Sequence, residues 1–423
     1  MRQGKVNRHW LPGPVTPGIV RPGGNHKTWD RPELGARQEE TGVRDAVIVA
    51  AVRTPVGKRN GALSGLHPVA LSAHVLNALV TRTGIDPAVV DDVVWGCVGQ
   101  VGEQTYDIAR TAVLAAGWPE TVTGVTVDRQ CGSSQQAVHF AAAGLIAGHY
   151  DVVVAGGVES MSRVPMGSSV QGADPLGAEF LARYDGVVPN QGIGAELVAE
   201  RWGLSRGQVD EYSVGSHEKA VAAQDAGRFE EQIAPVPLPG GGVVRADEGA
   251  RRDTSVDVLA GLRTAFRPDG VITAGNSSQI SDGAAGLLLT TSDRAAELGL
   301  APLARVHTAV LAGADPVIML TAPIPATRKA LTRSGLGLDE IGAFEVNEAF
   351  APVPLAWLAD LGADPKALNC NGGAIALGHP LGASGARLMT TLVHHMRDNG
   401  IHYGLQTMCE GGGQANATIL ELL

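Results

Sequence analysis

Apolar strand-like segments alternate with helix-like segments along most of this chain, and the alternation occurs twice. The first series begins at residues 45–57 and reaches the apolar segment at residues 151–157. The second series begins at residues 303–313 and ends with strand-like segments at residues 403–413 and 417–422. Strands that alternate with helices are typical of α/β proteins, in which a mostly parallel sheet is covered by helices on both faces. The pattern therefore predicts an α/β fold made of two similar halves.

The two series also correspond at particular points, which indicates an internal duplication. In the first half a strand leads through Cys131 into a helix, and in the second half a glycine-rich turn leads through His379 into a helix. The segment at residues 151–160 likewise corresponds to the segment at residues 404–413. Two halves related by a pseudo-two-fold axis would bring the starts of these helices together.

Two segments interrupt this order. Residues 1–44 are rich in Pro, Gly and charge without periodicity, and we predict a disordered extension, which an upstream start codon could produce. Residues 161–280 contain amphipathic helices and a charged middle, and such a length is too great for a structureless loop. We expect a separate subdomain there. The first half then comprises residues 45–160 and 281–301, and the second half residues 302–423.

Composition excludes several classes of function. The 423-residue chain has a formal net charge of −10, unlike the basic surfaces that bind nucleic acid. No run reaches the ~18 apolar residues of a membrane span, and no signal peptide is visible. The four cysteines form no CxxC pair, which disfavours a zinc ribbon and favours a reducing compartment over a disulfide framework. We therefore expect a cytoplasmic protein with neither a nucleic-acid partner nor a membrane span.

Cys131 is the first candidate for chemistry. It precedes Gly132 and a segment with helical spacing. A thiol at a helix N-terminus is favoured as the thiolate by the helix dipole and by free backbone N–H groups. The alternative is a small buried core residue, which is common for cysteine.

Three further motifs carry candidate residues. His379 lies between glycine pairs, where an imidazole can act as a general base or can be a hydrogen-bonded structural residue. Cys409 ends a strand before three glycines, a turn that could offer N–H groups to an oxyanion or could simply be tight. Asn347 and Glu348 interrupt an apolar stretch where a strand meets a helix, as an N-cap or as groups that orient a water or His379.

Together these motifs resemble those of the thiolase family. DRQCGSSQQA resembles its nucleophile motif, NEAFA its asparagine motif, GGAIALGHPLGASGARL its histidine motif and MCEGGG its second-cysteine motif. The motifs stand in the family's order, and the resemblance runs from about residue 46 to the C-terminus. It implies a five-layered αβαβα core of two βαβαβαββ halves, with residues 161–280 as an inserted CoA-binding loop domain.

The resemblance implies an acyltransferase that cleaves a 3-ketoacyl-CoA with CoA, or runs the reverse Claisen condensation, through an acyl-cysteine and ping-pong kinetics. It also implies lipid degradation by β-oxidation, CoA and acyl-CoA as substrates, no metal, no permanently bound cofactor, and a homodimer or homotetramer.

The same resemblance implies roles for individual residues. Cys131 would be the nucleophile, His379 would take its proton, Cys409 would be the second acid/base, and Asn347 would hold a water. The backbone N–H groups of Cys131 and Gly411 would form an oxyanion hole. Contacts to CoA and substrate would come from Arg251, Phe266, Ala274, Ser278, Ala349, Phe350 and Gln191.

Two departures from the family pattern bear on the substrate. Asn190-Gln191-Gly192 stands where short-chain acetoacetyl-CoA thiolases carry His-Met-Gly, and Met319–Pro323 replaces a glycine-rich turn. Both favour a longer or bulkier acyl group, as in degradative actinobacterial members. The alternatives are an acetoacetyl-CoA-specific biosynthetic acetyltransferase, a non-thiolase condensing enzyme, which Cys409 disfavours, and a thiolase-like lipid carrier, which the intact motifs disfavour.

Overall fold

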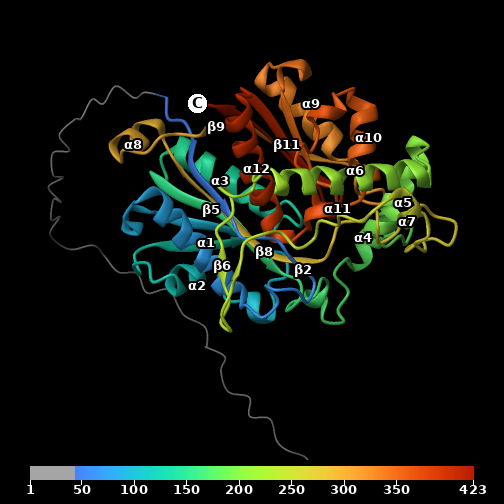
Figure 1. The fold of residues 1–423 in the computed structure, drawn as a ribbon, viewed down its shortest axis with the longest axis horizontal. Helices are drawn as coiled ribbons and strands as arrows, with labels where there is room; N and C mark the ends of the chain where they lie inside the picture. Colours follow the sequence, from blue (N-terminus) through green and yellow to red (C-terminus); the bar gives the residue numbers. More distant parts are fainter. Residues whose placement is uncertain (1–42) are drawn as a thin grey trace, which may run out of the picture. The chain divides into compact units, whose positions relative to one another are not determined.

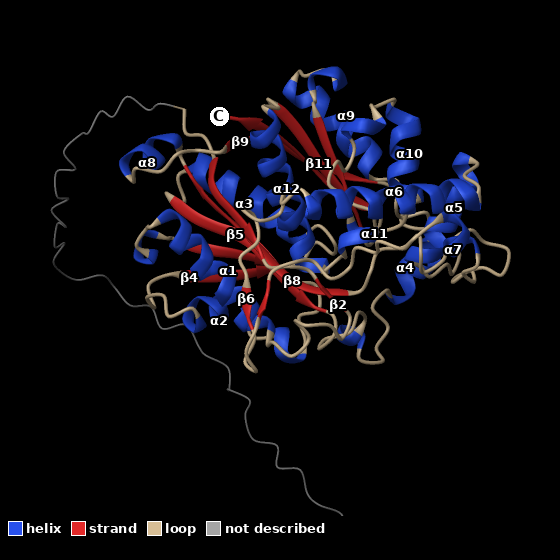
Figure 2. Cartoon of the chain, in the orientation of Figure 1, coloured by secondary structure: helices blue, strands red, loops and turns tan. Residues whose placement is uncertain are grey.

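The computed structural model describes residues 43–423. The predicted disordered extension, residues 1–44, falls almost entirely outside the described residues. Strands and helices alternate along the rest of the chain, as the periodicity predicts (Figures 1 and 2).

The first half begins with a buried strand and ends with another. Its helix α1 is delimited by sequence, because His67 caps the first turn before Pro68 and Gly84 closes the helix with φ 72°. The elements are β1 (Val47–Arg53), β2 (Gly57–Lys58), α1 (Pro68–Thr83), β3 (Asp92–Gly96), α2 (Ile108–Ala115), β4 (Thr123–Val127), α3 (Ser133–Ala147), β5 (Val152–Ser160) and β8 (Ser281–Thr290), followed by α8 (Ser292–Glu297).

The second half repeats this order without a long insertion before its last strand. Its helices also end at glycines in the left-handed conformation, among them Gly335 after α9 and Gly400 after α12. The elements are β9 (Ala304–Gly313), α9 (Pro323–Ser334), β10 (Ala343–Val346), α10 (Pro352–Leu361), α11 (Ala374–Leu377), α12 (Ser384–Asn399), β11 (Tyr403–Glu410) and β12 (Gln414–Leu422).

The pairing of the strands shows the duplication directly. The first half has the strand order β4-β3-β5-β8-β1, and the second half has β10-β11-β12-β9. A parallel bridge between Phe344 and Leu368 stands where the first half has β4. Val47 and Ile48 of β1 pair with Arg305 and Ala304 of β9, so the two half-sheets meet along a short seam.

The expectation of a mostly parallel sheet is wrong, because the sheet is mixed. β3 runs parallel to β4 and β5, and β10 runs parallel to β11. However, β8 and β12 return antiparallel to their neighbours, and β1 and β9 pair antiparallel with them in turn. The cause lies in the connections: β11 and β12 are joined by a tight glycine turn, and such a hairpin requires antiparallel strands.

Helices cover the half-sheets in layers, and the predicted αβαβα core is confirmed. α1 and α2 pack on the outer face of the first half around Trp95, and α9 and α10 pack on the outer face of the second half around Trp357. Between the half-sheets lie α3 and α12, whose apolar residues share one core with strands of both halves. Figure 2 shows these two helices between the strands of the two halves.

The segment between β5 and β8 runs from residue 161 to residue 280. It contains α4 (Gly177–Arg183), α5 (Gln191–Trp202), α6 (Arg206–Asp225), β6 (Val236–Pro237), β7 (Val243–Val244) and α7 (Val256–Ala260). In Figure 1 α6 crosses the second half, where it packs on α10 and α11. Residues 43–423 form a single compact unit, so the predicted domain boundaries stay a prediction.

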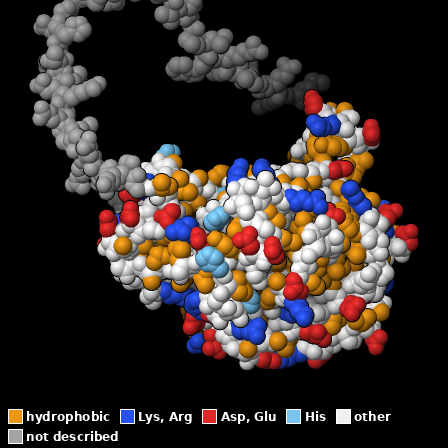
Figure 3. Space-filling model, turned by 90° about the horizontal axis from the view of Figure 1, so that it is seen from above, with side chains coloured by type: hydrophobic (Ala, Val, Ile, Leu, Met, Phe, Trp, Pro, Cys, Tyr) orange, Lys and Arg blue, Asp and Glu red, His pale blue; other side chains and the backbone are white. Residues whose placement is uncertain are grey.

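The surface and the helices also bear on partners. On the face drawn in Figure 3, Lys and Arg side chains lie interspersed with Asp and Glu side chains. Within residues 43–423, no helix combines the length and the apolar character needed to cross a bilayer.

Candidate active site

Cys131 lies at the corner between β4 and α3. The residue before it, Gln130, has φ 49°, a left-handed conformation that turns the chain sharply and is unfavourable for a residue other than glycine. The Ser133 hydroxyl fixes the corner, because it accepts from Arg129 N (2.9 Å) and donates to Gln130 O (2.6 Å). The thiol is thereby held at the start of α3, with the residue only 5% exposed.

The corner packs against the second half of the chain. Cys131 shares an apolar cluster with Met161, Leu381 and Met408. Leu381 lies two residues after His379, and Met408 directly precedes Cys409. The Cys131 charge is also the second cause, after burial, of the raised pKa of the Cys409 thiol. The three predicted catalytic motifs therefore meet at one place, although they are far apart in sequence.

The expectation that the helix start favours the Cys131 thiolate is not met in the resting structure. Burial raises the pKa of the Cys131 thiol to about 12, and the charges of Glu410, Glu159 and Asp128 add to it. Its own backbone hydrogen bond opposes this rise, but burial outweighs it. The resting group is therefore a thiol, and its reaction as a nucleophile requires a base.

His379 has the tautomer that a base needs. Ser384 Oγ donates to Pro380 O (2.8 Å), so its single proton is used there. Ser384 Oγ must then accept from Nδ1–H of His379, at 2.6 Å. This leaves Nε2 unprotonated, with a lone pair that can accept from Asn347 Nδ2 or take a proton. Burial, followed by the Arg387 charge, lowers the His379 pKa to about 3, so the imidazole is neutral at physiological pH.

Asn347 faces the same ring nitrogen. Its Nδ2 lies 3.4 Å from His379 Nε2, and its Oδ1 is buried with no hydrogen-bond partner in the described part of the chain. The N-cap interpretation of Asn347 is wrong, because the N-cap of α10 is Ala351. The side chain is therefore available to bind a water or a substrate oxygen.

Glu348 of the same motif has a structural function. Its carboxylate accepts from Tyr212 Oη (2.9 Å) and Ser216 Oγ (2.7 Å) of α6, and from Asn369 Nδ2 (3.0 Å). It also accepts from Ile375 N of α11, at 3.2 Å. Glu348 therefore links α6 and α11, which precedes His379, to the segment directly after β10 that carries Asn347.

The glycine turn after Cys409 reaches the nucleophile corner. Gly412 and Gly413 have φ of 83° and 76°, values that let the chain turn between β11 and β12. A Cβ atom on Gly411 would lie 2.9 Å from Gln130 Oε1, so this turn passes beside the residue that precedes Cys131. The turn that carries Gly411 therefore lies beside the Gln130 side chain, and the shared oxyanion hole of Gly411 and Cys131 stays a prediction.

Most of the predicted substrate contacts lie together. The Phe266 and Phe350 rings are 6.0 Å apart between centroids, edge to face, and Ser278 N donates to Ala349 O (3.0 Å). A Cβ atom on Gly192, the residue after Gln191, would overlap the Phe266 ring, so α5 begins directly against it. Arg251 is joined to α6, because its backbone N donates to His217 Nδ1 at 3.0 Å.

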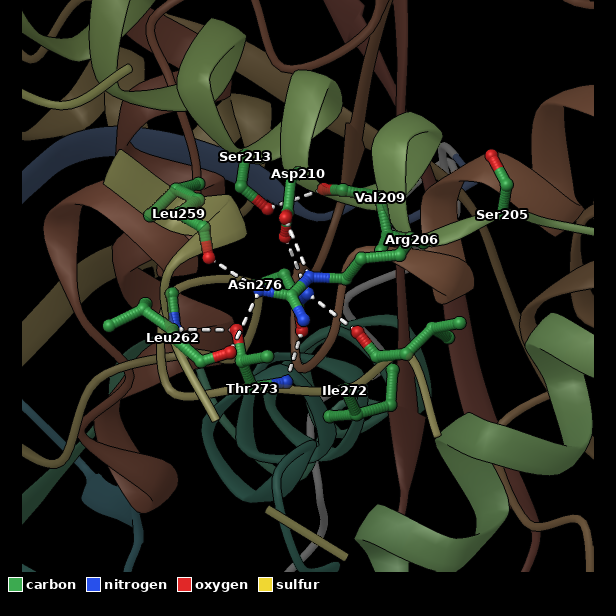
Figure 4. Close-up of polar contacts among 12 residues, drawn as sticks. Ser205, Arg206, Val209, Asp210, Ser213, Leu259, Leu262, Ile272, Thr273 and Asn276 are labelled. Carbon is green, nitrogen blue, oxygen red and sulfur yellow. Dashed lines mark hydrogen bonds and ion pairs between the residues drawn. The ribbon is translucent and has the colours of Figure 1, made fainter. Parts of the chain in front are cut away.

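A polar network fixes the loop that carries Ala274 and Ser278 (Figure 4). Asn276 Nδ2 donates to Asp210 Oδ1 (2.9 Å) of α6, and Asn276 Oδ1 accepts from Thr273 N (2.8 Å). Arg206 pairs with the other oxygen of Asp210 and also donates to Leu259 O. α6 therefore holds the loop around Ala274 and the Phe266 segment in one arrangement.

This fold, with a buried thiol, a neutral imidazole and a second thiol at one place, defines a thiolase-type acyltransferase. The chain belongs to the thiolase family, because residues 46–293 match the family model "Thiolase, N-terminal domain" and residues 300–422 match "Thiolase, C-terminal domain". The predicted family, fold class and enzyme class are thereby confirmed. The match also excludes the non-thiolase condensing enzyme as an alternative.

Named relatives show which members of the thiolase family this chain is similar to. The chain is 51% identical to a steroid 3-ketoacyl-CoA thiolase of Mycobacterium tuberculosis, over 90% of this chain and 94% of that protein. It is 43% identical to a 3-ketoacyl-CoA thiolase of Photobacterium profundum, over 90% of this chain and 100% of that protein. The crystal structure of the Bacillus anthracis acetyl-CoA acetyltransferase matches with a TM-score of 0.84 and 39% identity, covering 90% of this chain and 99% of that one.

Sequence reasoning missed two residues of the site. Ser384, which sets the His379 tautomer, lies inside the quoted histidine motif, where a hydroxyl five residues after an imidazole was the available signal. Glu410 lies in the second-cysteine motif, and nothing in the sequence indicates its burial beside Cys131.

Within residues 43–423, His, Cys, Asp and Glu side chains form no group of three that could hold a metal ion. The metal-free reaction stays a prediction, as do the individual catalytic roles.

Proposed function

We propose that this thiolase cleaves a 3-ketoacyl-CoA with CoA, giving acetyl-CoA and an acyl-CoA shortened by two carbons. The observation that carries the proposal is the convergence of the segments that carry Cys131, His379 and Cys409, which come from both halves. The names of the relatives, which include a 3-ketoacyl-CoA thiolase and a steroid 3-ketoacyl-CoA thiolase, support a degradative role in lipid metabolism.

The first half-reaction transfers the acyl group to the enzyme. His379 Nε2 takes the proton of the Cys131 thiol, and the thiolate attacks the 3-keto carbon. The bond between C2 and C3 then breaks, leaving the acyl group on Cys131 as a thioester and an acetyl-CoA enolate. Cys409 gives its proton to C2 of that enolate, so that acetyl-CoA leaves and Cys409 remains as a thiolate.

The second half-reaction restores the enzyme. The Cys409 thiolate takes the proton of incoming CoA, whose sulfur attacks the acyl-Cys131 thioester. Cys131 leaves as a thiolate and recovers its proton from the His379 imidazolium. Every proton is returned, so the cycle needs no external acid or base and shows ping-pong kinetics.

Two groups of donors would hold the oxygens that become negative. One oxygen lies with the backbone N–H groups of Cys131 and Gly411, whose segments pass side by side. The other lies with His379 and a water on Asn347, whose Oδ1 has no partner in the described chain. Such donors lower the barrier by about 3 kcal/mol each.

Coenzyme A would lie over the segment at residues 161–280, as the CoA-binding loop domain, and would reach the site past Phe266, Ser278 and Ala349. The Phe266–Phe350 pair and the start of α5 at Gln191 support this path. Arg251 would meet the nucleotide end, away from the aromatic pair. CoA and acyl-CoA are substrates in this proposal, with no permanently bound cofactor or metal.

The assembly would be a homodimer or homotetramer in the cytoplasm. β4 is an edge strand of the sheet, and its Val125 is 42% exposed. An open edge strand of this kind is suited to pairing with a second copy. The four cysteines are free thiols, as a reducing compartment would keep them.

A second candidate function is the biosynthetic condensation of two acetyl-CoA molecules. The likeness to the Bacillus anthracis acetyl-CoA acetyltransferase favours it. The Asn190–Gln191 sequence at the start of α5 argues for a bulkier acyl group, and the steroid thiolase relative shows the greater identity of the two.

The test is thiolysis across 3-ketoacyl-CoA substrates that range from acetoacetyl-CoA to sterol-derived ones, with purified wild type and Cys131→Ser. We expect the wild type to prefer long or sterol-derived substrates and the variant to lose at least about a thousandfold in kcat/KM while still folding. Retention of more than a tenth of the activity by the variant would refute Cys131 as the nucleophile. Cys409→Ala should still be acylated on Cys131 but should lose exchange of the acetyl α-protons.

A further inference from the structure

A buried carboxyl that the mechanism does not use lies beside the nucleophile corner. Glu410 directly follows Cys409 at the end of β11 and is 1% exposed. A Cβ atom on Gly132 would overlap Glu410 Oε1, so the carboxyl rests against the backbone between Cys131 and Ser133. The structure therefore places an acidic group at the start of α3, next to the sulfur that must become negative.

The first half has a corresponding carboxyl, and the two differ in their donors. Glu159 lies near the end of β5, and each carboxyl lies against a glycine that precedes the central helix of the other half: Glu410 against Gly132 and Glu159 against Gly382. The donors to Glu159 are the backbone N–H groups of Val98, Gly99 and Gly382 and the side-chain amide of Gln104. Glu410 Oε1 accepts from Asn416 N (3.0 Å), and its Oε2 has no partner in the described chain.

An unpartnered acceptor faces Glu410. Asn416 Nδ2 donates to Gln136 Oε1 (3.1 Å) and lies 3.2 Å from His139 Nδ1, which turns Asn416 Oδ1 the other way. That oxygen would lie 2.5 Å from the same Cβ atom on Gly132, and it has no donor among residues 43–423. An ionised Glu410 would leave two acceptors side by side without a proton between them, whereas a protonated one has an O–H to donate.

We propose that Glu410 is a positioning residue that stays protonated at neutral pH, donates its O–H to Asn416 Oδ1, and so keeps negative charge away from Cys131. The inference rests on the proposed role of Cys131 as the nucleophile. Burial raises the pKa of Glu410 to about 8, against the opposing charge of Arg129. After burial, the Glu410 charge is the largest cause of the raised Cys131 pKa.

Other charges around this place do not replace Glu410. Arg129 Nη1 donates to Gln414 Oε1 (2.9 Å), so the guanidinium is engaged with β12. Burial lowers the His139 pKa to about 3, so that ring is neutral. The titratable groups that face Glu410 or Cys131 are Asp128 and Arg129 before α3, His139 on α3, Cys409 on β11, Glu159 on β5 and, in the proposed mechanism, the neutral His379 before α12.

The test measures the reactivity of Cys131 rather than turnover. Wild type and Glu410→Gln are alkylated with iodoacetamide from about pH 6 to about pH 10, and modification of the Cys131 peptide is followed by mass spectrometry. The amide keeps a donor for Asn416 Oδ1 and an acceptor for Asn416 N but cannot ionise. We expect equal rates below pH 7 and a rate about tenfold higher in the variant above pH 9, because a like charge nearby shifts a pKa by about one unit. A rate ratio that is the same at every pH overturns the proposal.

Glu345→Gln is the matched control. Glu345 is a buried carboxyl on β10 whose pKa burial also raises to about 8, but its charged neighbours are Arg387, Glu348 and Lys219. This variant should leave the Cys131 profile unchanged, and a shift equal to that of Glu410→Gln counts against a specific role.

If Glu410→Gln does not fold, the wild-type profile decides. The rate of Cys131 alkylation should rise with pH, and this rise should become less steep near pH 8, where Glu410 ionises. Such a change of slope supports the proposal, and a rise without it overturns the proposal. The proposed function is tested by a separate experiment. Retention of thiolysis by Cys131→Ser would refute that function, whatever the alkylation profiles show.

Discussion

The two halves build the same strand-to-helix corner and use it differently. In the first half the corner places Cys131 directly before Gly132 and the start of α3. In the second half Leu381 stands before Gly382 in the corresponding place, and His379 lies two residues earlier in the loop. Leu381 packs against Cys131, so the two corners meet at these residues. The duplication therefore brings the two corners together, and the corners differ in the residues proposed to catalyse the reaction, Cys131 and His379.

The two buried histidines give the largest test of this comparison. His139 on α3 and His379 before α12 both have pKa values of about 3 because of burial. We expect His379→Gln to lose roughly a thousandfold in kcat for thiolysis, because a general base contributes about 10²–10⁴-fold. His139→Gln, whose ring contacts Thr418 and Asn416, should stay within about threefold. Comparable losses of kcat in both variants would show that activity depends on the burial of an imidazole and not on its position before α12.

The two corner glycines should differ in the free energy of unfolding. A Cβ atom on Gly382 would lie 2.6 Å from Val158 O, 2.7 Å from Cys97 Cα and 2.8 Å from Gly96 O, all of them backbone atoms. On Gly132 the overlap is with the ends of the Glu410 and Asn416 side chains, which can move. We expect Gly382→Ala to cost about 3 kcal/mol or more and Gly132→Ala about 1 kcal/mol in urea unfolding. Equal costs would mean that the Glu410 carboxyl is as rigid as the backbone.

The corresponding serines after these glycines form the third pair. Ser384 accepts from His379 Nδ1, whereas Ser134 Oγ accepts from Ala386 N (2.9 Å) of α12. Ser384→Ala should lower kcat about 10- to 100-fold, because the ring loses the group that fixes its tautomer. Ser134→Ala should keep kcat within about threefold and lower the free energy of unfolding by about 1 kcal/mol. Steady-state kinetics and urea unfolding of both variants make the comparison, and a kcat loss confined to Ser134→Ala would reverse the assignment.

The smallest effect concerns the pH dependence of stability. A histidine with a pKa of about 3 in the folded state and ~6.5 in the unfolded state takes up its proton mainly on unfolding. Stability is therefore full above pH ~6.5 and falls as the pH drops towards 3. Between pH 7.5 and pH 6.0 each such histidine costs roughly 0.8 kcal/mol. The free energy of unfolding is measured with urea at both pH values. Its decrease from the higher to the lower pH should be roughly 0.8 kcal/mol smaller in His139→Gln than in wild type. An equal decrease in the two proteins would contradict the low pKa of His139.

Much of the fold could be predicted from the sequence. Apolar runs such as those of β5 and β8 and the glycines that end α1 and α9 are local signals, and the structure places elements there. The mixed character of the sheet was not predicted, because it depends on which strand each returning segment pairs with. β2 and the seam between β1 and β9 are likewise set by tertiary contacts rather than by local pattern.

The residues of the candidate site could be predicted from the sequence, but their pKa values and protonation states could not. The motifs named Cys131, His379, Cys409 and Asn347, and the structure brings them together. The helix-start argument gave the wrong sign for the resting Cys131 pKa, because the extent of burial cannot be read from sequence. The tautomer of His379 depends on the proton of Ser384, which is determined by the Pro380 carbonyl in three dimensions.

The crossing of α3 and α12 constrains how this protein can change. A Cβ atom on Gly385 would overlap Gln135 N, and Ala386 N donates to Ser134 Oγ, so the two helices touch backbone to backbone. Each helix belongs to a different half of the chain. A chimera that took one half from a relative would join two surfaces that had diverged separately, and we expect natural substitutions along this crossing to be inherited in matched pairs.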